Sequence, residues 1–259
     1  MYLPRHAKIH SPRLVIFDFD GTLFRTQESI SHCISLTFSA LSQPAPTPEA
    51  IRSSIATGAA LDETFRMLGA GRASPIVSQG PAGSENSSGE ADADADADFD
   101  TSLWIDTYRS TYAEEGLPLI TPFPHARSLM AFLKKAGIST VVISNKGVKA
   151  VEAVLNKEKM AGLVDLVLGD MPGVPRKPDP TSYLRFVAPN FATPADRLNP
   201  DDVMVVGDTT ADIQFAKNIG AVSCWARYGY GDAERCEGLG PDLVIESLEE
   251  LERIVSITV

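Results

Sequence analysis

Residues Arg13–Thr26 read "RLVIFDFDGTLFRT", an apolar run that ends in two acidic residues. Four apolar residues, Leu14 to Phe17, lead directly into Asp18 and Asp20. A short continuous apolar run is typical of a strand buried on both faces of a parallel sheet. Two neighbouring carboxylates raise each other's pKa unless a cation or a proton lies between them. The stretch therefore predicts a buried strand whose carboxyl end holds a cation.

Alternating strand and helix patterns fill the second half of the chain, from Pro118 onward. Continuous apolar strands separated by helices predict a parallel sheet covered on both faces. We therefore expect an α/β fold with a doubly wound, Rossmann-like parallel sheet. The expected strands are 139–144, 163–169, 202–207, 221–226 and 242–245, and the expected helices are 126–136, 148–157, 180–187, 211–219 and a final helix.

The residues between the first strand and Pro118 show helical spacing of apolar residues instead. Helices are expected over 27–41, from Pro48 onward, over 61–68, and in a segment that ends at Gly116. Pro48 fits just inside a helix start, because its missing N–H has no partner to lose there. We expect an all-helical cap domain, residues 25–116, inserted into a core domain of residues 1–24 and 117–259. The cleft between the two is the expected ligand site.

Within the expected cap, residues 72–98 are rich in Gly, Ser, Ala and Asp and offer almost nothing to bury. Such a segment does not recover the entropy lost on ordering, so we expect it to be disordered. Its repeated Ala-Asp dipeptides could bind calcium, but they lack the glycine turn and the fixed spacing of a calcium loop.

Composition excludes several function classes. The net charge of −11 argues against nucleic-acid binding, although seven of the carboxylates lie between Glu85 and Asp100. No apolar run approaches the length of about 20 residues that a membrane span needs, and the first residues lack the apolar segment of a signal peptide. The three cysteines are widely spaced, which fits reduced thiols in a cytoplasmic protein and gives no zinc motif.

Polar residues follow four of the expected strands. Because ligands bind at the carboxyl ends of parallel strands, these side chains should converge on one edge of the sheet. Carboxylates suit Mg²⁺, and a hydroxyl with an ammonium suits phosphoryl oxygens. The residues are Asp18, Asp20, Gly21 and Thr22 after the first strand, Ser144 and Asn145 after the next, Asp170 followed by Lys177, and Asp208 followed by Asp212.

Polar residues at the ends of strands also have ordinary structural interpretations. Thr209 or Thr210 after a strand is expected to be a helix N-cap, and Asp170 is expected to be a turn or capping residue rather than a metal ligand. Lys177 and Ser144 could be solvated loop residues. The occurrence of matching residues at four strand ends in the same chain favours a site.

These four segments resemble the motifs of the haloacid dehalogenase superfamily of phosphatases. They read "DFDGT", "VVISN", "RKPDP" and "GDTTAD". Residues 112–138 are similar to the return from helical cap to core in the phosphoglycolate phosphatase-like subgroup. The second aspartate of "DFDGT" is typical of the phosphoryl-transfer members and not of the dehalogenating ones.

The resemblance implies an Mg²⁺-dependent reaction through an aspartyl-phosphate. Asp18 would be the nucleophile and Asp20 the acid and base, while Ser144 and Lys177 would hold phosphate and neutralise charge. The implied metal site comprises Asp18, Asp20 through its backbone carbonyl, Asp208 and Asp212, and the implied supporting contacts are Asn145, Gly21 and Thr22.

Two features depart from the resemblance. Relatives often have an acidic residue and a Ser after "DGTL", whereas this chain has Phe24, Arg25 and Thr26. Arg25 could contact a second anionic group of the substrate or could be a hinge-packing residue. The acidic insertion alters the cap, which in this family selects the substrate. Thr57 and Gly58 could reach into the cleft or could form a turn between helices.

The sequence therefore predicts an Mg²⁺-dependent phosphatase of a small phosphorylated metabolite. A phosphomutase of the same family is one alternative, since its core chemistry is the same. A non-catalytic binding protein on the same fold is the other. Oligomeric state is left open.

Overall fold

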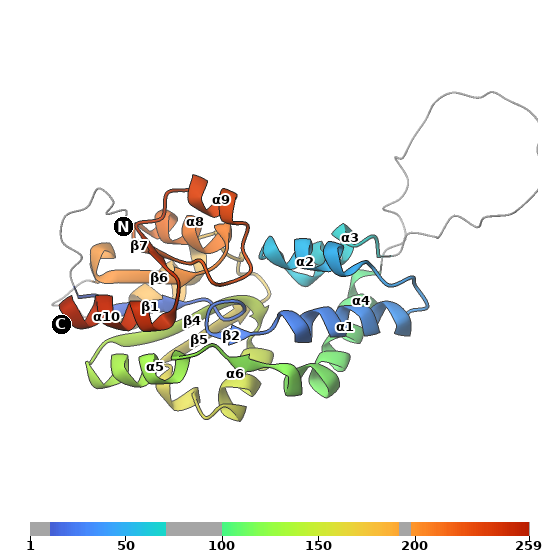
Figure 1. Cartoon of the computed structure of the whole chain (residues 1–259), viewed down its shortest axis with the longest axis horizontal. Helices are drawn as coiled ribbons and strands as arrows, with labels where there is room; N and C mark the ends of the chain where they lie inside the picture. Colours follow the sequence, from blue (N-terminus) through green and yellow to red (C-terminus); the bar gives the residue numbers. More distant parts are fainter. Residues whose placement is uncertain (1–10, 71–99, 192–197, 259) are drawn as a thin grey trace, which may run out of the picture.

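The computed structural model describes residues 11–70, 100–191 and 198–258. Its centre is a six-stranded sheet with the strand order β5-β4-β1-β6-β7-β8, in which every neighbouring pair is parallel (Figure 1). The predicted α/β fold with a doubly wound parallel sheet is confirmed. The strands are β1 (Leu14–Phe17), β4 (Ser139–Gly147), β5 (Leu166–Asp170), β6 (Val203–Gly207), β7 (Val222–Ala226) and β8 (Leu243–Ile245).

Strand β1 lies at the point where the strand order reverses, between β4 and β6. Its last residue, Phe17, is in register with Val142 on one side and Val206 on the other. The residues that follow these positions therefore emerge side by side at one edge of the sheet. A reversal point of this kind is the usual ligand crevice of an open parallel sheet.

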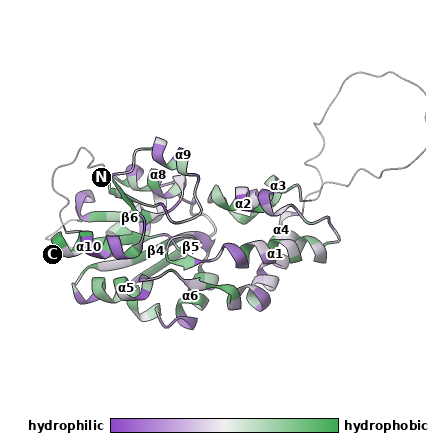
Figure 2. Ribbon diagram, viewed as in Figure 1, coloured by the Kyte–Doolittle hydropathy of each residue, from purple (hydrophilic) through white to green (hydrophobic). Residues whose placement is uncertain are grey.

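Alternate residues of β1 explain why its sequence is continuously apolar. Val15 and Phe17 belong to a core layer that includes side chains of α5 (Ala126–Lys135), α6 (Val148–Lys157) and α10 (Leu248–Thr258). Their neighbours in β1 belong to a second layer with α8 (Thr210–Ile219) and η4 (Tyr183–Val187). Figure 2 shows the hydrophobic residues concentrated on the strands, while the flanking helices carry both hydrophobic and hydrophilic residues.

A group of helices, which we call the helical lobe, projects from the carboxyl edge of the sheet (Figure 1). Its core is aromatic, with Trp104 packed 4.7 Å from Phe38 and 5.3 Å from Phe65 between ring centroids. A short ribbon of β2 (Phe24–Arg25) and β3 (Thr121–Pro122) joins it to the sheet. Its helices are α1 (Gln27–Ala40), α2 (Pro48–Ala56), α3 (Leu61–Met67), α4 (Thr101–Thr111), η1 (Tyr112–Gly116) and η2 (Leu117–Leu119).

Most predicted elements are present, with shifts at some ends. Strand β4 continues to Gly147, three residues past the predicted end at Ser144. The predicted helix 180–187 is largely the π-helix η4, followed by α7 (Ala188–Phe191). The ribbon and α9 (Ala233–Gly238) were not predicted, since both are too short for a periodic pattern.

The predicted insertion, 72–98, lies outside the described residues. The boundaries that we assign to core (1–24 and 117–259) and cap (25–116) remain a proposal. All three cysteines are free and buried. No helix in the described ranges has both the length and the apolar character to cross a membrane.

Candidate active site

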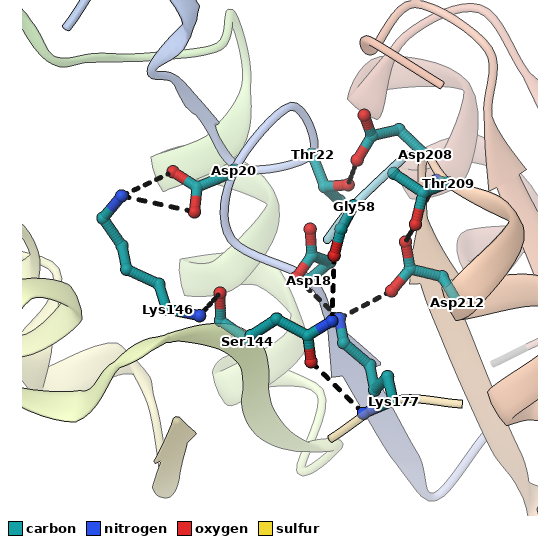
Figure 3. Close-up of polar contacts among 11 residues, drawn as sticks. Asp18, Asp20, Thr22, Gly58, Ser144, Lys146, Lys177, Asp208, Thr209 and Asp212 are labelled. Atoms are coloured by element: carbon teal, nitrogen blue, oxygen red, sulfur yellow. Dashed lines mark hydrogen bonds and ion pairs between the residues drawn. The ribbon is translucent and has the colours of Figure 1, made fainter. Parts of the chain in front are cut away.

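The predicted polar residues meet at the carboxyl edge of the sheet, around the end of β1 (Figure 3). Asp18 follows β1, Ser144 lies in β4, Lys177 follows β5 and Asp208 follows β6. All four residues are buried, between 0% and 8% exposed. Charged groups are rarely this inaccessible unless each has a partner, so the contacts among them decide what the site can do.

Lys177 connects two of the carboxylates. Its Nζ donates to Asp18 Oδ1 and to Asp212 Oδ1, each at 2.6 Å. Burial disfavours its ammonium group, but the two aspartates outweigh this effect, and the pKa of Lys177 lies above its ordinary value. Lys177 is therefore a fixed positive charge beside Asp18.

Asp208 is held by groups from two segments, the loop after β1 and the loop that contains Tyr230. Its Oδ1 accepts from the Thr22 hydroxyl at 2.9 Å, and its Oδ2 accepts from the Tyr230 N–H at 2.7 Å. Gly21 lies against this carboxylate with φ of +79°, and a Cβ at this position would collide with the Asp208 side chain. The predicted supporting residues Gly21 and Thr22 thus support Asp208 directly.

Asp212 makes two sets of contacts, one with the N-cap residue of α8 and one with Lys177. Thr209 is the N-cap residue of α8, as expected, and its N–H and hydroxyl both donate to Asp212 Oδ2, at 3.0 and 2.7 Å. The other oxygen of Asp212 accepts from Lys177. Asp212 therefore ties the start of α8 to Lys177 as well as adding negative charge.

The buried carboxylates carry more negative charge than Lys177 neutralises. Burial raises the pKa of Asp18 well above its ordinary value, with Lys177 opposing and the other aspartates adding to the rise. Burial, together with Asp212, raises the pKa of Asp208 to about 7, against the Tyr230 and Thr22 hydrogen bonds. In the absence of another cation, these carboxyls retain protons to higher pH than usual.

The three aspartates fit a divalent cation. Asp18, Asp208 and Asp212 each offer an oxygen, and these atoms all lie within 4.8 Å of one another. Hard carboxylate oxygens are the ligands that Mg²⁺ prefers, and the excess negative charge would be compensated by such an ion. The residues present therefore match a magnesium site.

Asp20 has a partner that sequence reasoning missed. Lys146 Nζ donates to Asp20 Oδ1 at 3.2 Å and lies 4.4 Å from the centre of the Tyr112 ring. Its side chain is 12% exposed, and Asp20 with Tyr112 holds the pKa of Lys146 above its ordinary value despite burial. Lys146 thus joins the second aspartate of the motif to an aromatic residue of η1.

Asn145 contacts both the core and the helical lobe. Its Nδ2 donates to the Gly58 carbonyl at 3.0 Å, and its Oδ1 accepts from the Lys177 N–H at 3.2 Å. Gly58 has φ of +67° in the turn after α2 and also lines the cavity. It therefore forms a turn between helices and reaches into the cleft, the two interpretations given for this position. The turn reaches the core and sets the lobe against the sheet edge. The Oγ of Ser144, the residue before Asn145, accepts from the Lys146 N–H at 3.2 Å.

A cavity of about 730 Å³ opens above these groups. Its inner end is lined by Asp18, Asp20 and the strand-end residues of β4, and its walls come from α1, α2, α4 and α6. A cavity with a few charged and polar side chains at one end and apolar walls around the rest is the usual form of a small-molecule site.

Two residues singled out in the sequence make contacts other than those expected. Arg25 is exposed on the β2–β3 ribbon with its guanidinium 5.0 Å from the Phe123 ring centre, outside the cavity lining, so the hinge-packing alternative describes it. Asp170 is neither a turn residue nor a cap but an acceptor for Arg176 Nε at 2.8 Å. Arg176 also reaches Asp62 of α3 at 3.1 Å, so this pair bridges sheet and lobe.

Comparison with known proteins agrees with this geometry. The family model described as haloacid dehalogenase-like hydrolase matches residues 15–226. The chain is 28% identical to the phosphoglycolate phosphatase of Vibrio parahaemolyticus over 246 residues, covering 95% of this chain and 97% of that protein. It is 29% identical to the phosphoglycolate phosphatase of Salmonella typhi over 249 residues, covering 94% and 92%. A haloacid dehalogenase-like family hydrolase from Streptococcus pneumoniae superposes with a TM-score of 0.71 at 21% identity, covering 94% and 99%.

The chain therefore belongs to the haloacid dehalogenase-like hydrolase family. Within it, the similarity is to the phosphoglycolate phosphatases, as the motifs predicted. The predicted enzyme class, a phosphoric monoester hydrolase of this family, is confirmed.

Proposed function

We propose that this chain is an Mg²⁺-dependent phosphatase that hydrolyses a small phosphorylated metabolite through a phosphoryl group carried on Asp18. The observation that carries the proposal is the position of Asp18. It directly follows the central strand, accepts from Lys177 at 2.6 Å and lines the cavity, and one of its carboxylate oxygens lies within 4.8 Å of oxygens of two further aspartates. A carboxylate nucleophile is an established route of covalent phosphoryl transfer.

Each residue has a part in the proposed first step. Asp18 attacks phosphorus, the bond from phosphorus to the substrate oxygen breaks, and Asp20 donates a proton to the leaving alkoxide. Lys177, Ser144 and backbone N–H groups stabilise the phosphoryl oxygens. Lys146 lies close enough to stabilise the negative charge that Asp20 gains when it gives up its proton.

The second step reverses the role of Asp20. It accepts a proton from water, the water oxygen bonds to phosphorus, and the bond to Asp18 breaks, which frees phosphate and restores the carboxylate. Asp18, Asp208 and the Asp20 backbone carbonyl would hold Mg²⁺, with Asp212 in support. When bound, the ion would neutralise charge on the transferring phosphoryl group.

The relatives suggest phosphoglycolate as a first substrate to test, because they are named for it. The alternative of a phosphomutase uses the same residues, and a non-catalytic binding protein would have no need of a nucleophile positioned by Lys177. Phosphate release from a panel of phosphomonoesters with Mg²⁺ and with EDTA tests the proposal. Metal-dependent release that Asp18→Asn abolishes supports it, and release that is equal in EDTA or in the variant contradicts it.

A further inference from the structure

The cavity extends well beyond the space that a phosphoryl group needs. Its volume of about 730 Å³ lies within the range of roughly 300 to 1,000 Å³ that is typical of sites for drug-sized ligands. The glycolate part of phosphoglycolate is only a carboxylate on a single methylene group. Most of the cavity would therefore remain unfilled by that substrate.

The walls of the cavity are mainly apolar. They include Ile30 of α1, Ile55 of α2, Ile105 and Tyr108 of α4, Leu117 of η2 and Ala153 of α6. Apart from Tyr108, which is buried, these side chains are half-buried rather than sealed in the core, so they face a space that a ligand can enter. Apolar surface of this kind gains free energy when an apolar group displaces water from it.

The cations at the inner end of the cavity already have carboxylate partners. Lys146 pairs with Asp20 at 3.2 Å, and Arg176 pairs with Asp170 at 2.8 Å. A carboxylate on the leaving group would have to compete with these partners, or else reach an exposed cation farther along the wall. These cations are Lys149 at the start of α6 and Arg109 of α4, which lies 4.0 Å from Asp170. The charge distribution therefore favours a leaving group without a carboxylate near the reacting centre.

From these observations we infer that the cavity binds the leaving group of the substrate, and that this group is an extended and mostly apolar alcohol. The inference rests on the proposed phosphatase activity and adds its substrate class. The phosphoryl group would lie at Asp18 and Lys177, and the body of the alcohol would lie against Ile105, Tyr108 and Ala153.

A series of straight-chain alkyl phosphates, from ethyl to hexyl, tests the inference on the unaltered protein. Their alcohols are of similar acidity, so differences in kcat/KM report binding of the chain and not the chemistry of the leaving group. We expect kcat/KM to rise about fourfold for each methylene that enters the apolar cavity, and hexyl phosphate to exceed phosphoglycolate. Values that are flat or falling along the series would overturn the inference.

Two variants of the wall give an independent test. Ile105→Glu is expected to lower kcat/KM for hexyl phosphate at least tenfold. Leu103→Glu is the control and should not lower it, because Leu103 is half-exposed on the same helix and lies outside the cavity lining. Ala153→Phe fills the cavity and should lower the hexyl value more than the ethyl value. Equal losses with ethyl and hexyl phosphate in both wall variants would contradict a role for the wall in binding.

A binding measurement separates this inference from the proposed function. Hexylphosphonate and ethylphosphonate cannot be hydrolysed at their carbon–phosphorus bond, and their affinities are measured by calorimetry with Mg²⁺ present. If hexylphosphonate binds roughly tenfold or more tightly than ethylphosphonate, the apolar cavity is supported even if no ester is turned over. Lack of turnover would then count only against the proposed phosphatase activity. Equal affinities overturn the cavity proposal even if every ester is hydrolysed.

Discussion

The floor and the walls of the cavity are built in opposite ways. On the floor, Asp18, Asp208 and Lys177 are buried and are held by hydrogen bonds or ion pairs from other segments. On the walls, residues such as Ile30 and Ile105 make apolar surface and are only half-buried. The floor thus fixes reacting groups in place, whereas the walls can change without disturbing them. The chemistry should therefore be sensitive to substitutions on the floor, and substrate choice to substitutions on the walls.

The largest effect is expected from Asp18→Asn. The amide is a poor nucleophile for phosphorus, so kcat should fall by about four orders of magnitude or more, as when a covalent nucleophile is removed in other hydrolases. Steady-state phosphate release with Mg²⁺ is the measurement, and the melting temperature provides the folding control. A fall of less than about tenfold would show that Asp18 does not form the covalent bond.

Gly21→Ala is expected to have the next largest effect. The new Cβ would collide with the Asp208 carboxylate, so kcat should fall by roughly a hundredfold and Mg²⁺ affinity should weaken. Gly137→Ala is the matched control, because Gly137 has a similar φ of +75° but open space around it. Both variants carry the left-handed backbone cost of about 1–2 kcal/mol, and only the first should lose activity. Equal activity in the two would contradict the assigned role of Gly21.

Lys146→Met tests the partner of Asp20. Removing the ammonium leaves the Asp20 carboxylate without its 3.2 Å ion pair, and we expect kcat to fall about ten- to a hundredfold. The pH profile of kcat should move with it, which a merely structural change would not cause. Lys135→Met, at an exposed position on α5, is the control and should leave both unchanged. An unaltered kcat in Lys146→Met would remove this residue from the site.

The smallest effect expected is on stability, and it depends on pH. In the metal-free protein the pKa of Asp208 is raised to about 7, above its unfolded value of about 3.9. The folded state therefore binds more protons between these values, and the free energy of unfolding falls as pH rises through this window. Because Mg²⁺ competes with that proton, the rise in Tm on adding Mg²⁺ should be larger at about pH 8 than at about pH 5, by a few degrees. Asp208→Asn should reduce the difference, with the raised pKa of Asp18 maintaining the remainder. An equal rise at both pH values in the unaltered protein would contradict the account.

The strand ends were predictable because they follow from local pattern alone. Apolar runs such as Leu14–Phe17 mark buried strands, and the polar residues after them meet once the sheet is parallel. The residues that meet at the sheet edge could therefore be predicted from their positions directly after these apolar runs. The capping threonine, Thr209, followed from the same local rules.

The features of the site that were not predicted depend on contacts between segments that are distant in sequence. Lys146 was not singled out because β4 continues past Ser144 and carries this side chain toward Asp20, which is 126 residues away in sequence. Tyr230 acts on Asp208 through its backbone N–H, which no side-chain pattern reveals. The Arg176 bridge to Asp62 likewise requires the two lobes to be in place.

The most direct test of the central claim is to trap the phosphoryl group on the protein. In Asp20→Asn, a substrate with a good leaving group, such as p-nitrophenyl phosphate, should still react with Asp18, while hydrolysis of the product is slowed because no base activates water. Acid quenching and peptide mass spectrometry should then find one phosphoryl group on the peptide that contains Asp18, and none in the double variant Asp18→Asn with Asp20→Asn. A phosphoryl group on another residue, or release of p-nitrophenol with no phosphorylated peptide, would contradict the account.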